Sequence, residues 1–586
     1  MNKINSPRFV PLVVAIGIVF GILIGSFYAN HYSGNRLNII NTSSNKINDL
    51  LHIIDAQYVD KVSISDLVEK AMPQILKELD PHSTYTTAKD VEASMTELKG
   101  SFSGIGVQFT IYGDTVHIIR VLPGGPSEEV GLMAGDRIVS IDGKAYTGKI
   151  VTDTTTMKLL KGPAESTVRL GVVRPGTRGK LNFSIVRGDV PVKSIDAVYM
   201  LDETTGYIRI NSFAETTYSE FLAALARLNH DGFRNLVLDL RGNLGGYMAP
   251  AVQIANEFLP KDRLILYTEG HRSPRKEYMS DGRGSYQNLP LVVLIDEGTA
   301  SASEILAGAI QDNDRGTVVG RRSFGKGLVQ EPIEFSDGSL LRLTIARYYT
   351  PSGRCLQKPY VPGDEEAYEN DLFERAVHGE YFSRDSIRTS GKSYKTVGGR
   401  TVYGGGGIIP DIFVPRDTLG MTSYFKEAYL RGLLYLYACE FVDAHRPALR
   451  KLVSVDDVVA YLDKHDIPQG FAAFGERNGL KRRNLMLKTS HSLFENYIYG
   501  YIIDQLLGEA ASAEYVNRTD KTVQEALHVV RERRTFPARK VKKSRRQARA
   551  GMEPLWQPRL QSVLPSWSRT NPVVCPACPR QHFAVL

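Results

Sequence analysis

The chain has 586 residues, 42% of them apolar, so it is too long for one ordinary domain and can fill several hydrophobic cores. Its net charge of +8 would suit a nucleic-acid-binding protein, but ten Lys or Arg and one Glu lie between Arg531 and Arg549, and the rest is near neutrality. Four cysteines are too few for a disulfide scaffold.

Residues 1–29 are predicted to form a cytoplasmic stub and a transmembrane anchor. Phe9 to Ala29 is an uninterrupted apolar run, long enough to cross a bilayer as a helix. Lys3 and Arg8 precede it, which keeps the N-terminus in the cytoplasm and places the rest of the chain across the membrane. A cleaved signal peptide is the alternative, but cleavage after Ala29 would put bulky Phe27 where a small side chain is needed. An uncleaved anchor is favoured.

Residues 30–95 are predicted to be a helical N-terminal arm, because apolar residues recur at helical spacing from Leu37 to Leu79 and Pro81 then stops the helix. Residues 96–190 read as short strands with glycine-rich turns. Two stretches there, 103–109 and 131–143, together resemble a PDZ domain. That resemblance implies that a loop offers backbone N–H groups to the terminal carboxylate of a peptide. The loop residues are Gly104, Ile105, Gly106 and Val107.

Residues 191–420 alternate between strand and helix, which predicts a layered α/β domain with a surface insertion at 363–395. The expected strands are 207–210, 236–240, 264–267 and 291–295, and the expected helices are 218–228, 249–258 and 301–312. Residues 421–530 have a helical pattern with no recognisable chemistry. Residues 531–586 form a basic tail that is predicted to be disordered, and its Cys575 and Cys578 are interpreted as ordinary thiols, because no second ligand pair suggests zinc.

Ser301 is the candidate nucleophile. A tight turn of small residues joins the buried strand at 291–295 to a helix start, where free N–H groups and the helix dipole favour developing negative charge. A simple helix cap is the alternative at this position. A serine nucleophile also needs a base, and His82, His230 and His271 look like ordinary loop residues.

Lys326 is the candidate base, because burial lowers the pKa of a lysine and Gly325 and Gly327 allow close backbone approach. The next strand would hold Gln330 within reach of its amine. A solvated loop lysine is one alternative. A phosphate-binding loop is another, but Gly327 stands where Ser or Thr is required and a strand pattern follows where a helix should begin.

Several strings in order resemble the C-terminal processing, or tail-specific, peptidases: L-D-P-H-S-T-Y from Leu79, D-L-R-G-N-L-G-G from Asp239, G-T-A-S-A-S-E-I-L around Ser301, G-K-G-x-V-Q around Lys326 and Y-Y-T-P-S-G-R from Tyr348. The resemblance covers about residues 35–420 and implies a crotonase/ClpP-like core. It makes Ser301 the nucleophile, Lys326 the general base and Gln330 its positioning residue.

The same resemblance places the oxyanion hole at the N–H of Ala302 and the Gly245–Gly246 turn, with Asp312 in a supporting role. It implies a serine endopeptidase that takes protein or peptide substrates by free C-termini, with no metal or organic cofactor and no nucleic acid. The predicted anchor at Phe9–Ala29, with Lys3 and Arg8 before it, places the protein in the bacterial inner membrane, with the catalytic part on the periplasmic side.

Two other functions fit the sequence less well. A catalytically silent binding protein of the same fold would not need both Ser301 and Lys326, and a pure PDZ scaffold would leave the α/β domain without a role. The sequence leaves open a homo-oligomer or an activating partner. Cys355 follows Y-Y-T-P-S-G-R where relatives carry a small polar residue, which suggests that oxidation there would affect the enzyme.

Overall fold

The computed structural model describes residues 17–21, 43–91, 94–95, 100–389, 392–532 and 584–585. The chain divides into two compact units, Met1–Leu76 and Lys77–Leu586. In the first unit, the helical spacing of the sequence corresponds to two helices, α2 (Ser43–Gln57) and α3 (Ile64–Lys77), and the last residue of α3 begins the second unit.

The predicted membrane anchor falls almost entirely outside the described residues. Within Phe9–Ala29 only 17–21 are described, and they are helical. Among the residues that the structure describes, no helix has both the length and the apolar composition needed to cross a bilayer. The anchor therefore stays a prediction from sequence.

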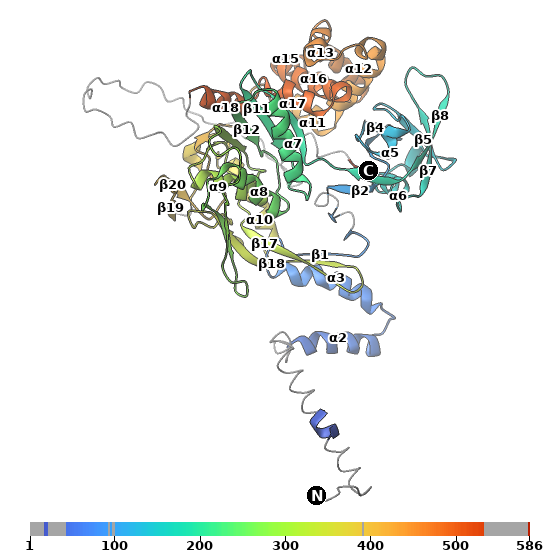
Figure 1. Ribbon diagram of the computed structural model, residues 1–586. Helices are drawn as coiled ribbons and strands as arrows, with labels where there is room; N and C mark the ends of the chain where they lie inside the picture. Colours follow the sequence, from blue (N-terminus) through green and yellow to red (C-terminus); the bar gives the residue numbers. More distant parts are fainter. Residues whose placement is uncertain are drawn as a thin grey trace, which may run out of the picture. The chain divides into compact units, whose positions relative to one another are not determined.

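The second unit contains a small antiparallel domain over the region that resembles a PDZ domain (Figure 1). Its sheet has the order β3-β4-β5-β7-β8, with β6 beside β5 and a separate β2–β9 pair. Alternate residues of β3 and β7 point into a buried apolar core, as expected for strands with one covered face. The elements are β2 (Ser101–Gly104), β3 (Val107–Tyr112), β4 (Thr115–Val121), α5 (Pro126–Glu129), β5 (Arg137–Ile141), β6 (Lys144–Ala145), η2 (Gly148–Ile150), α6 (Asp153–Leu160), β7 (Thr167–Val173), β8 (Lys180–Val186) and β9 (Gly188–Pro191).

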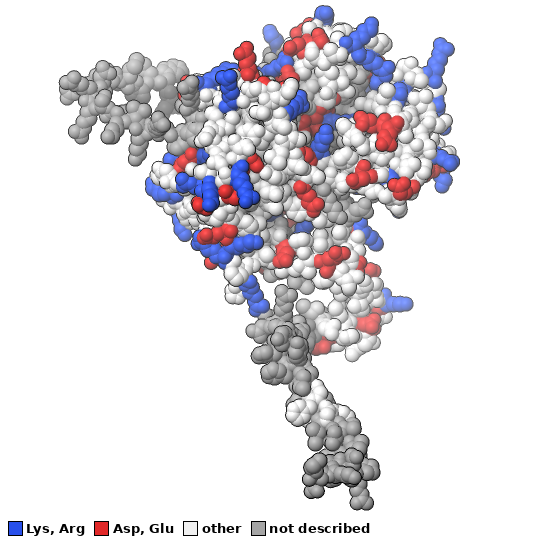
Figure 2. Space-filling model, viewed as in Figure 1, with Lys and Arg blue, Asp and Glu red and all other residues white. Residues whose placement is uncertain are grey.

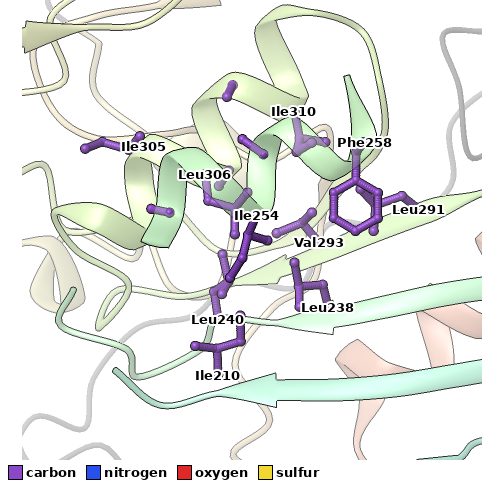
Figure 3. Packing of buried hydrophobic residues seen from close by; sticks show 14 of the residues in the cluster. Ile210, Leu238, Leu240, Ile254, Phe258, Leu291, Val293, Ile305, Leu306 and Ile310 are labelled. Atoms are coloured by element: carbon purple, nitrogen blue, oxygen red, sulfur yellow. The ribbon is translucent and has the colours of Figure 1, made fainter. Parts of the chain in front are cut away.

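The α/β domain is built on a six-stranded sheet of order β10-β11-β12-β15-β16-β21. β10 is antiparallel to β11, and the pairs from β11 to β21 are parallel. Helices α8 and α9 pack their apolar residues on one face, as Figure 3 shows for Ile254, Phe258, Leu306 and Ile310 over Leu238 and Val293. The elements are β10 (Ile195–Met200), β11 (Thr205–Ile210), α7 (Thr217–His230), β12 (Asn235–Asp239), α8 (Met248–Phe258), β15 (Leu291–Ile295), α9 (Ala302–Asp312), β16 (Thr317–Gly320) and β21 (Ile412–Phe413).

A second sheet lies beside this core and changes one expectation. The strand predicted at 264–267 is β13 (Leu264–Glu269), but it pairs with β14 (Lys276–Met279) and β18 (Leu340–Tyr349) rather than with the parallel strands. β18 also pairs with β17 (Leu328–Glu334) and with β1 (Thr84–Thr86). Periodicity identified the strand, but long-range pairing determined its sheet.

The polar segment predicted as a surface insertion at 363–395 contains α10 (Glu365–Val377), η3 (Arg384–Ser386) and β19 (Ser393–Lys395), which pairs with β20 (Thr401–Tyr403). It is not only peripheral. The side chain of Arg375 is 4% exposed, and its guanidinium donates to the carbonyl oxygen of Ser323 at 3.1 Å, two residues before the G-K-G segment. The insertion therefore supports the loop that carries Lys326.

Residues 423–531 form the predicted helical region, with its own apolar core. The last helix, α18, does more than extend this region. Its buried Val523, Ala526 and Val529 pack on the second face of the six-stranded sheet, against Val237 and Val292 among others. The helices are α11 (Ser423–Leu430), α12 (Leu433–Leu449), α13 (Val455–Leu462), α14 (Ile467–Arg477), α15 (Asn484–Thr489), α16 (His491–Leu507), α17 (Glu509–Asn517) and α18 (Lys521–Arg531).

The tail predicted to be disordered lies mostly outside the described residues. Two of its residues form a short strand, β22 (Ala584–Val585), which pairs with β3. On the face of the molecule in Figure 2, Lys and Arg are interspersed with Asp and Glu over the described residues. That distribution agrees with a chain whose excess charge is concentrated at 531–549.

Candidate active site

The turn after β15 holds Ser301 in a strained backbone conformation. Ser301 has φ +56° and ψ −117°, a region that side-chain-bearing residues rarely adopt, and α9 begins at the next residue. The turn is fixed from both sides, because the N–H of Ala300 donates to Asn243 O at 2.9 Å and the hydroxyl of Thr299 donates to Leu240 O at 2.9 Å. This surrounding structure stabilises a side chain at the helix N-terminus, the position predicted for a nucleophile.

Glu304 joins the serine turn to the lysine loop. Its carboxylate is fully buried and accepts the N–H of Ser301 at 3.0 Å, the N–H of Lys326 at 2.8 Å and the N–H of Gly325 at 2.8 Å. The hydroxyl of Ser323 donates to the same carboxylate at 2.5 Å. Desolvation raises the pKa of Glu304 to about 7, although the four donors oppose the shift. One side chain thus fixes both predicted catalytic residues.

The Lys326 amine is held by the residue that the sequence suggested. Nζ donates to Gln330 Oε1 at 3.0 Å, and the Gln330 amide in turn donates to the backbone carbonyl of His82. Desolvation lowers the pKa of Lys326, and the positive charge of Arg342 adds to this effect. β17 positions Gln330 four residues after the lysine.

Tyr348 provides a second bridge between the two segments. Its side chain is 1% exposed, and its hydroxyl donates to the carbonyl of Lys326 and lies 3.2 Å from the carbonyl oxygen of Ser301. The Tyr348 N–H also donates to Gly327 O at 3.0 Å. The first residue of the Y-Y-T-P-S-G-R string therefore stabilises the relative position of the predicted nucleophile and base.

The Gly245–Gly246 turn lies directly against Ser301. A Cβ atom added at Gly245 would lie 2.7 Å from Ser301 Cβ and 3.0 Å from the backbone nitrogen of Ala302, and Gly245 has φ +104°. Its own N–H donates to Asn243 Oδ1 at 2.8 Å, which favours Gly246 as the oxyanion donor of this pair. The predicted oxyanion residues thus surround the serine turn, with Gly245 supplying space.

His82 is not the ordinary loop residue that the sequence suggested. Its ring lies 2.7 Å from the Tyr368 hydroxyl, and its backbone carbonyl holds Gln330. Desolvation and, after it, the charge of Lys326 lower the pKa of His82 to about 4, so the ring is neutral at physiological pH. The L-D-P-H-S-T-Y string is the only local signal for this contact, because the partners are far apart in sequence.

Asp312 lies at the opposite end of α9 from Ser301. Its carboxylate and the Arg354 guanidinium are both fully buried, 2.7 Å apart, and the Ser352 hydroxyl also donates to Asp312. An α-helix rises about 1.5 Å per residue, so eleven residues separate Asp312 from the nucleophile by about 16 Å. Asp312 therefore supports the far end of α9 and contacts the Y-Y-T-P-S-G-R loop rather than the reacting atoms.

The predicted peptide-binding loop lies between β2 and β3. Gly104 ends β2 and Val107 begins β3, while Gly106 has φ +76°. The carbonyl oxygens of Ile105 and Gly106 accept N–H groups from Ser127 at 2.9 Å and Leu122 at 2.9 Å, which fixes the turn. The loop therefore stands directly before β3, which is the place of a carboxylate loop in a PDZ domain.

Two further sequence features need only a brief account. Cys575 and Cys578 lie outside the described residues. In the described part of the chain, no group of three or more His, Cys, Asp or Glu is placed to hold a metal ion.

Three family models match the chain. They are peptidase family S41 over residues 204–367, a PDZ domain over residues 103–185, and a family of unknown function (DUF8443) over residues 424–508. The first two cover the region of the predicted site residues, and the third covers most of the helical region.

The chain is similar to curated proteases and to solved structures. It is 34% identical to the carboxy-terminal-processing protease of Bartonella bacilliformis over 53% of this chain and 72% of the relative, and 34% identical to the carboxy-terminal processing protease CtpB of Bacillus subtilis over 56% and 68%. A structure of the photosystem II D1 C-terminal processing protease is 27% identical, with a TM-score of 0.33, over 64% of this chain and 95% of that one.

Proposed function

The chain belongs to the carboxy-terminal processing proteases of peptidase family S41 and is a serine-type peptidase, and on that basis we propose that Ser301 and Lys326 form its catalytic dyad. One observation carries the proposal. The buried Glu304 carboxylate accepts N–H groups from both residues, which fixes the nucleophile and the base relative to each other. A silent binding protein would not require this arrangement.

The proposed reaction follows from the groups around the dyad. Neutral Lys326, favoured by burial, takes the proton of the Ser301 hydroxyl as the oxygen attacks a peptide carbonyl. The N–H groups of Ala302 and Gly246 stabilise the tetrahedral oxyanion, and the Lys326 ammonium then protonates the leaving amine. Water releases the acyl-enzyme by the reverse proton path. Gln330 accepts one hydrogen of the amine, which restricts the orientation of the Lys326 lone pair.

We propose further that substrates are proteins or peptides that enter by their C-terminal tails. The loop from Gly104 to Val107 would receive the terminal carboxylate, and the edge of β3 opposite β4 would pair with the tail. The curated relatives are named for carboxy-terminal processing, which supports this substrate class.

The decisive test is cleavage of an unfolded protein with an apolar C-terminal tag by the detergent-solubilised full chain. Ser301→Ala and Lys326→Ala are expected to reduce kcat/KM by at least about 1,000-fold, since nucleophile and base act as a unit. Ser219→Ala and Lys261→Ala, on exposed positions, are matched controls and should keep full activity. Chelator should change none of the rates. If both site variants cut like the parent, the dyad is wrong.

Location is a separate proposal. We propose that Phe9–Ala29 anchors the chain in the bacterial inner membrane with the catalytic part on the extracytoplasmic side. Ile18→Arg, which would cost about 3 kcal/mol at a helix centre, is expected to move the chain into the soluble fraction. Ile47→Arg, on an exposed side chain of α2, should leave it in the membrane pellet. A parent chain that is soluble after cell lysis would contradict the anchor.

A further inference from the structure

Tyr368 connects the insertion helix α10 to two side chains near the proposed base. It lies in the first turn of α10 and is 6% exposed, although the sequence predicted a surface insertion here. Two partners meet at its hydroxyl. His82 Nε2 lies 2.7 Å from it, and Gln357 Nε2 donates to it at 3.2 Å. A buried hydroxyl with two such partners fixes their positions relative to each other.

The first partner leads to the Lys326 amine. The backbone carbonyl of His82 accepts a hydrogen bond from the Gln330 amide, and Gln330 Oε1 accepts one from Lys326 Nζ at 3.0 Å. His82 therefore has its ring on Tyr368 and its carbonyl on Gln330. A restraint on the ring thus also restrains the group that holds the amine.

The second partner leads to the backbone beside the lysine. Gln357 Oε1 accepts the N–H of Gly327 at 2.9 Å, and Gln357 Nε2 donates to the carbonyl of Lys358 at 2.9 Å as well as to Tyr368. Because the amide oxygen can only accept and the NH2 group can only donate, these contacts fix the orientation of the amide. Gly327 directly follows Lys326, so both paths from the Tyr368 hydroxyl end at the same lysine.

The direction of each hydrogen bond follows from the chemistry of the partners. The Gln357 NH2 group donates to the Tyr368 oxygen, so the hydroxyl hydrogen is available to His82. His82 Nε2 accepts that hydrogen when it carries no proton, as in a neutral ring with its proton on Nδ1. Desolvation and, after it, the charge of Lys326 lower the pKa of His82 to about 4, so the ring is neutral at physiological pH. The network is therefore complete in the state that the enzyme needs.

Lys358 holds Tyr368 in this place. Its Nζ donates to the Tyr368 carbonyl at 2.8 Å and to the Asp371 carboxylate at 3.1 Å, and it lies 4.0 Å from the centroid of the Tyr368 ring. The Lys358 N–H donates to Gly325 O at 2.8 Å, on the other side of the proposed base. Tyr368, Asp371 and Arg375 follow each other at spacings of three and four, which places them on one face of α10.

We propose that Tyr368 is a positioning residue for Lys326, through which the insertion helix α10 sets the orientation of the amine. This rests on the proposed function, because it takes Lys326 as the base. Without the hydroxyl, His82 loses the partner of its ring and Gln357 loses one of its acceptors. A displacement of about 1 Å costs about 100-fold in rate, so a partial loss of this restraint is expected to lower kcat about tenfold.

Tyr368→Phe removes the hydroxyl alone, and Tyr381→Phe is the matched control. Tyr381 is a buried tyrosine of the same insertion, 3% exposed, and its hydroxyl donates to Leu372 O at 2.8 Å within α10. Both variants should lower the urea midpoint of unfolding. On the tagged substrate, Tyr368→Phe should lower kcat about tenfold with KM within about twofold, and Tyr381→Phe should keep the kcat of the parent. Equal kcat values in the two variants would refute the proposal.

The pKa of Lys326 is a readout that a loss of stability alone would not move. The titratable and charged groups that face the amine are Arg342, Asp80, Glu304 and His82. Desolvation is the main cause that lowers the pKa of Lys326, and a looser network lets water reach the amine. Tyr368→Phe should therefore raise this pKa toward the usual lysine value and move the kcat profile to higher pH.

That pKa is measured without catalysis, in the full chain with Ser301→Ala. Trace acetylation with acetic anhydride over a range of pH, followed by mass spectrometry, gives the fraction of neutral Lys326. A pKa that is the same in Tyr368→Phe and Tyr381→Phe would overturn the positioning role. If Lys326→Ala keeps full activity, the dyad is wrong, but the labelling still decides whether Tyr368 holds the amine. If the dyad is right and Tyr368→Phe behaves like its control, the positioning role fails alone.

Discussion

Replacement of Glu304 by Gln is the sharpest test of the site geometry. The carboxylate accepts four hydrogen bonds, from the N–H groups of Ser301, Gly325 and Lys326 and from the Ser323 hydroxyl. An amide has one acceptor oxygen, so its NH2 group must face the donors at the other position. If the NH2 group replaces Oε2, the N–H groups of Ser301 and Lys326 lose their acceptor. If it replaces Oε1, the N–H of Gly325 loses its acceptor, while the Ser323 hydroxyl can rotate to accept.

The magnitude follows from that count. A buried donor without a partner costs about 1–3 kcal/mol, so one or two lost acceptors destabilise the fold by about 1–6 kcal/mol. A displacement of about 1 Å between nucleophile and base costs about 100-fold in rate. We therefore expect Glu304→Gln to lower kcat by about 100-fold or more. We also expect it to lower the urea concentration at the midpoint of unfolding.

The assay pairs tagged-substrate kinetics with urea unfolding, and the matched control is Glu257→Gln. Glu257 is also a buried helical glutamate, but its partners are the Tyr218 hydroxyl and the N–H of Ser285, away from the dyad. The Glu257→Gln variant should be less stable than the parent, but the folded variant should have the kcat of the parent. If Glu304→Gln retains kcat within about threefold and unfolds at the parent midpoint, Glu304 does not bridge the two segments.

The remaining predictions concern the base, the oxyanion turn and Cys355. Activity is expected to rise with pH, because only the neutral Lys326 amine can take the serine proton. The pH of half-maximal kcat should lie below the usual pKa of a lysine, since burial lowers the pKa of Lys326. A kcat that falls as the pH rises would contradict this role. Gly245→Ala is expected to abolish cleavage, because the new Cβ would lie 2.7 Å from Ser301 Cβ. The control is Gly232→Ala, where a Cβ meets nothing within 4 Å, and it should reduce stability without changing the rate of cleavage. An active Gly245→Ala enzyme would contradict the role of the Gly245–Gly246 turn in the oxyanion hole. Burial raises the pKa of the Cys355 thiol, so little reactive thiolate forms. The Cys355→Ser variant should therefore have the same activity as the parent before and after treatment with peroxide. Inactivation of the parent alone would instead support a redox role for Cys355.

The site was predictable where the signal is local and not where it depends on long-range contacts. Ser301, Lys326 and Gln330 stand in short strings whose residue types match their chemistry, and the structure places Gln330 on the lysine amine. Glu304 occupies the third residue of α9, a position typical of a helix cap, so nothing in the sequence indicates that it also reaches Lys326. His82 contacts Gln330 across 248 positions, a separation that periodicity cannot detect.

The fold shows the same division. Buried runs such as 291–295 and the helix at 302–312 were identified from hydrophobic pattern and turn residues. The strand at 264–267 was identified as well, but its sheet was not, because the pattern of one strand does not specify its neighbours. The prediction that residues 421–530 are helical was correct, although the last helix, α18, packs in the core of the α/β domain.

That last element changes how the C-terminal region should be understood. The buried face of α18 comprises Val523, Ala526 and Val529, which cover the second side of the catalytic sheet. The residue that caps the start of this helix is Asp520, whose carboxylate accepts a hydrogen bond from Arg241 at 2.8 Å. Arg241 belongs to the D-L-R-G-N-L-G-G string that ends in the oxyanion turn. A parallel sheet needs both faces covered, so α18 belongs to the hydrophobic core of the α/β domain although it follows the helical region in sequence.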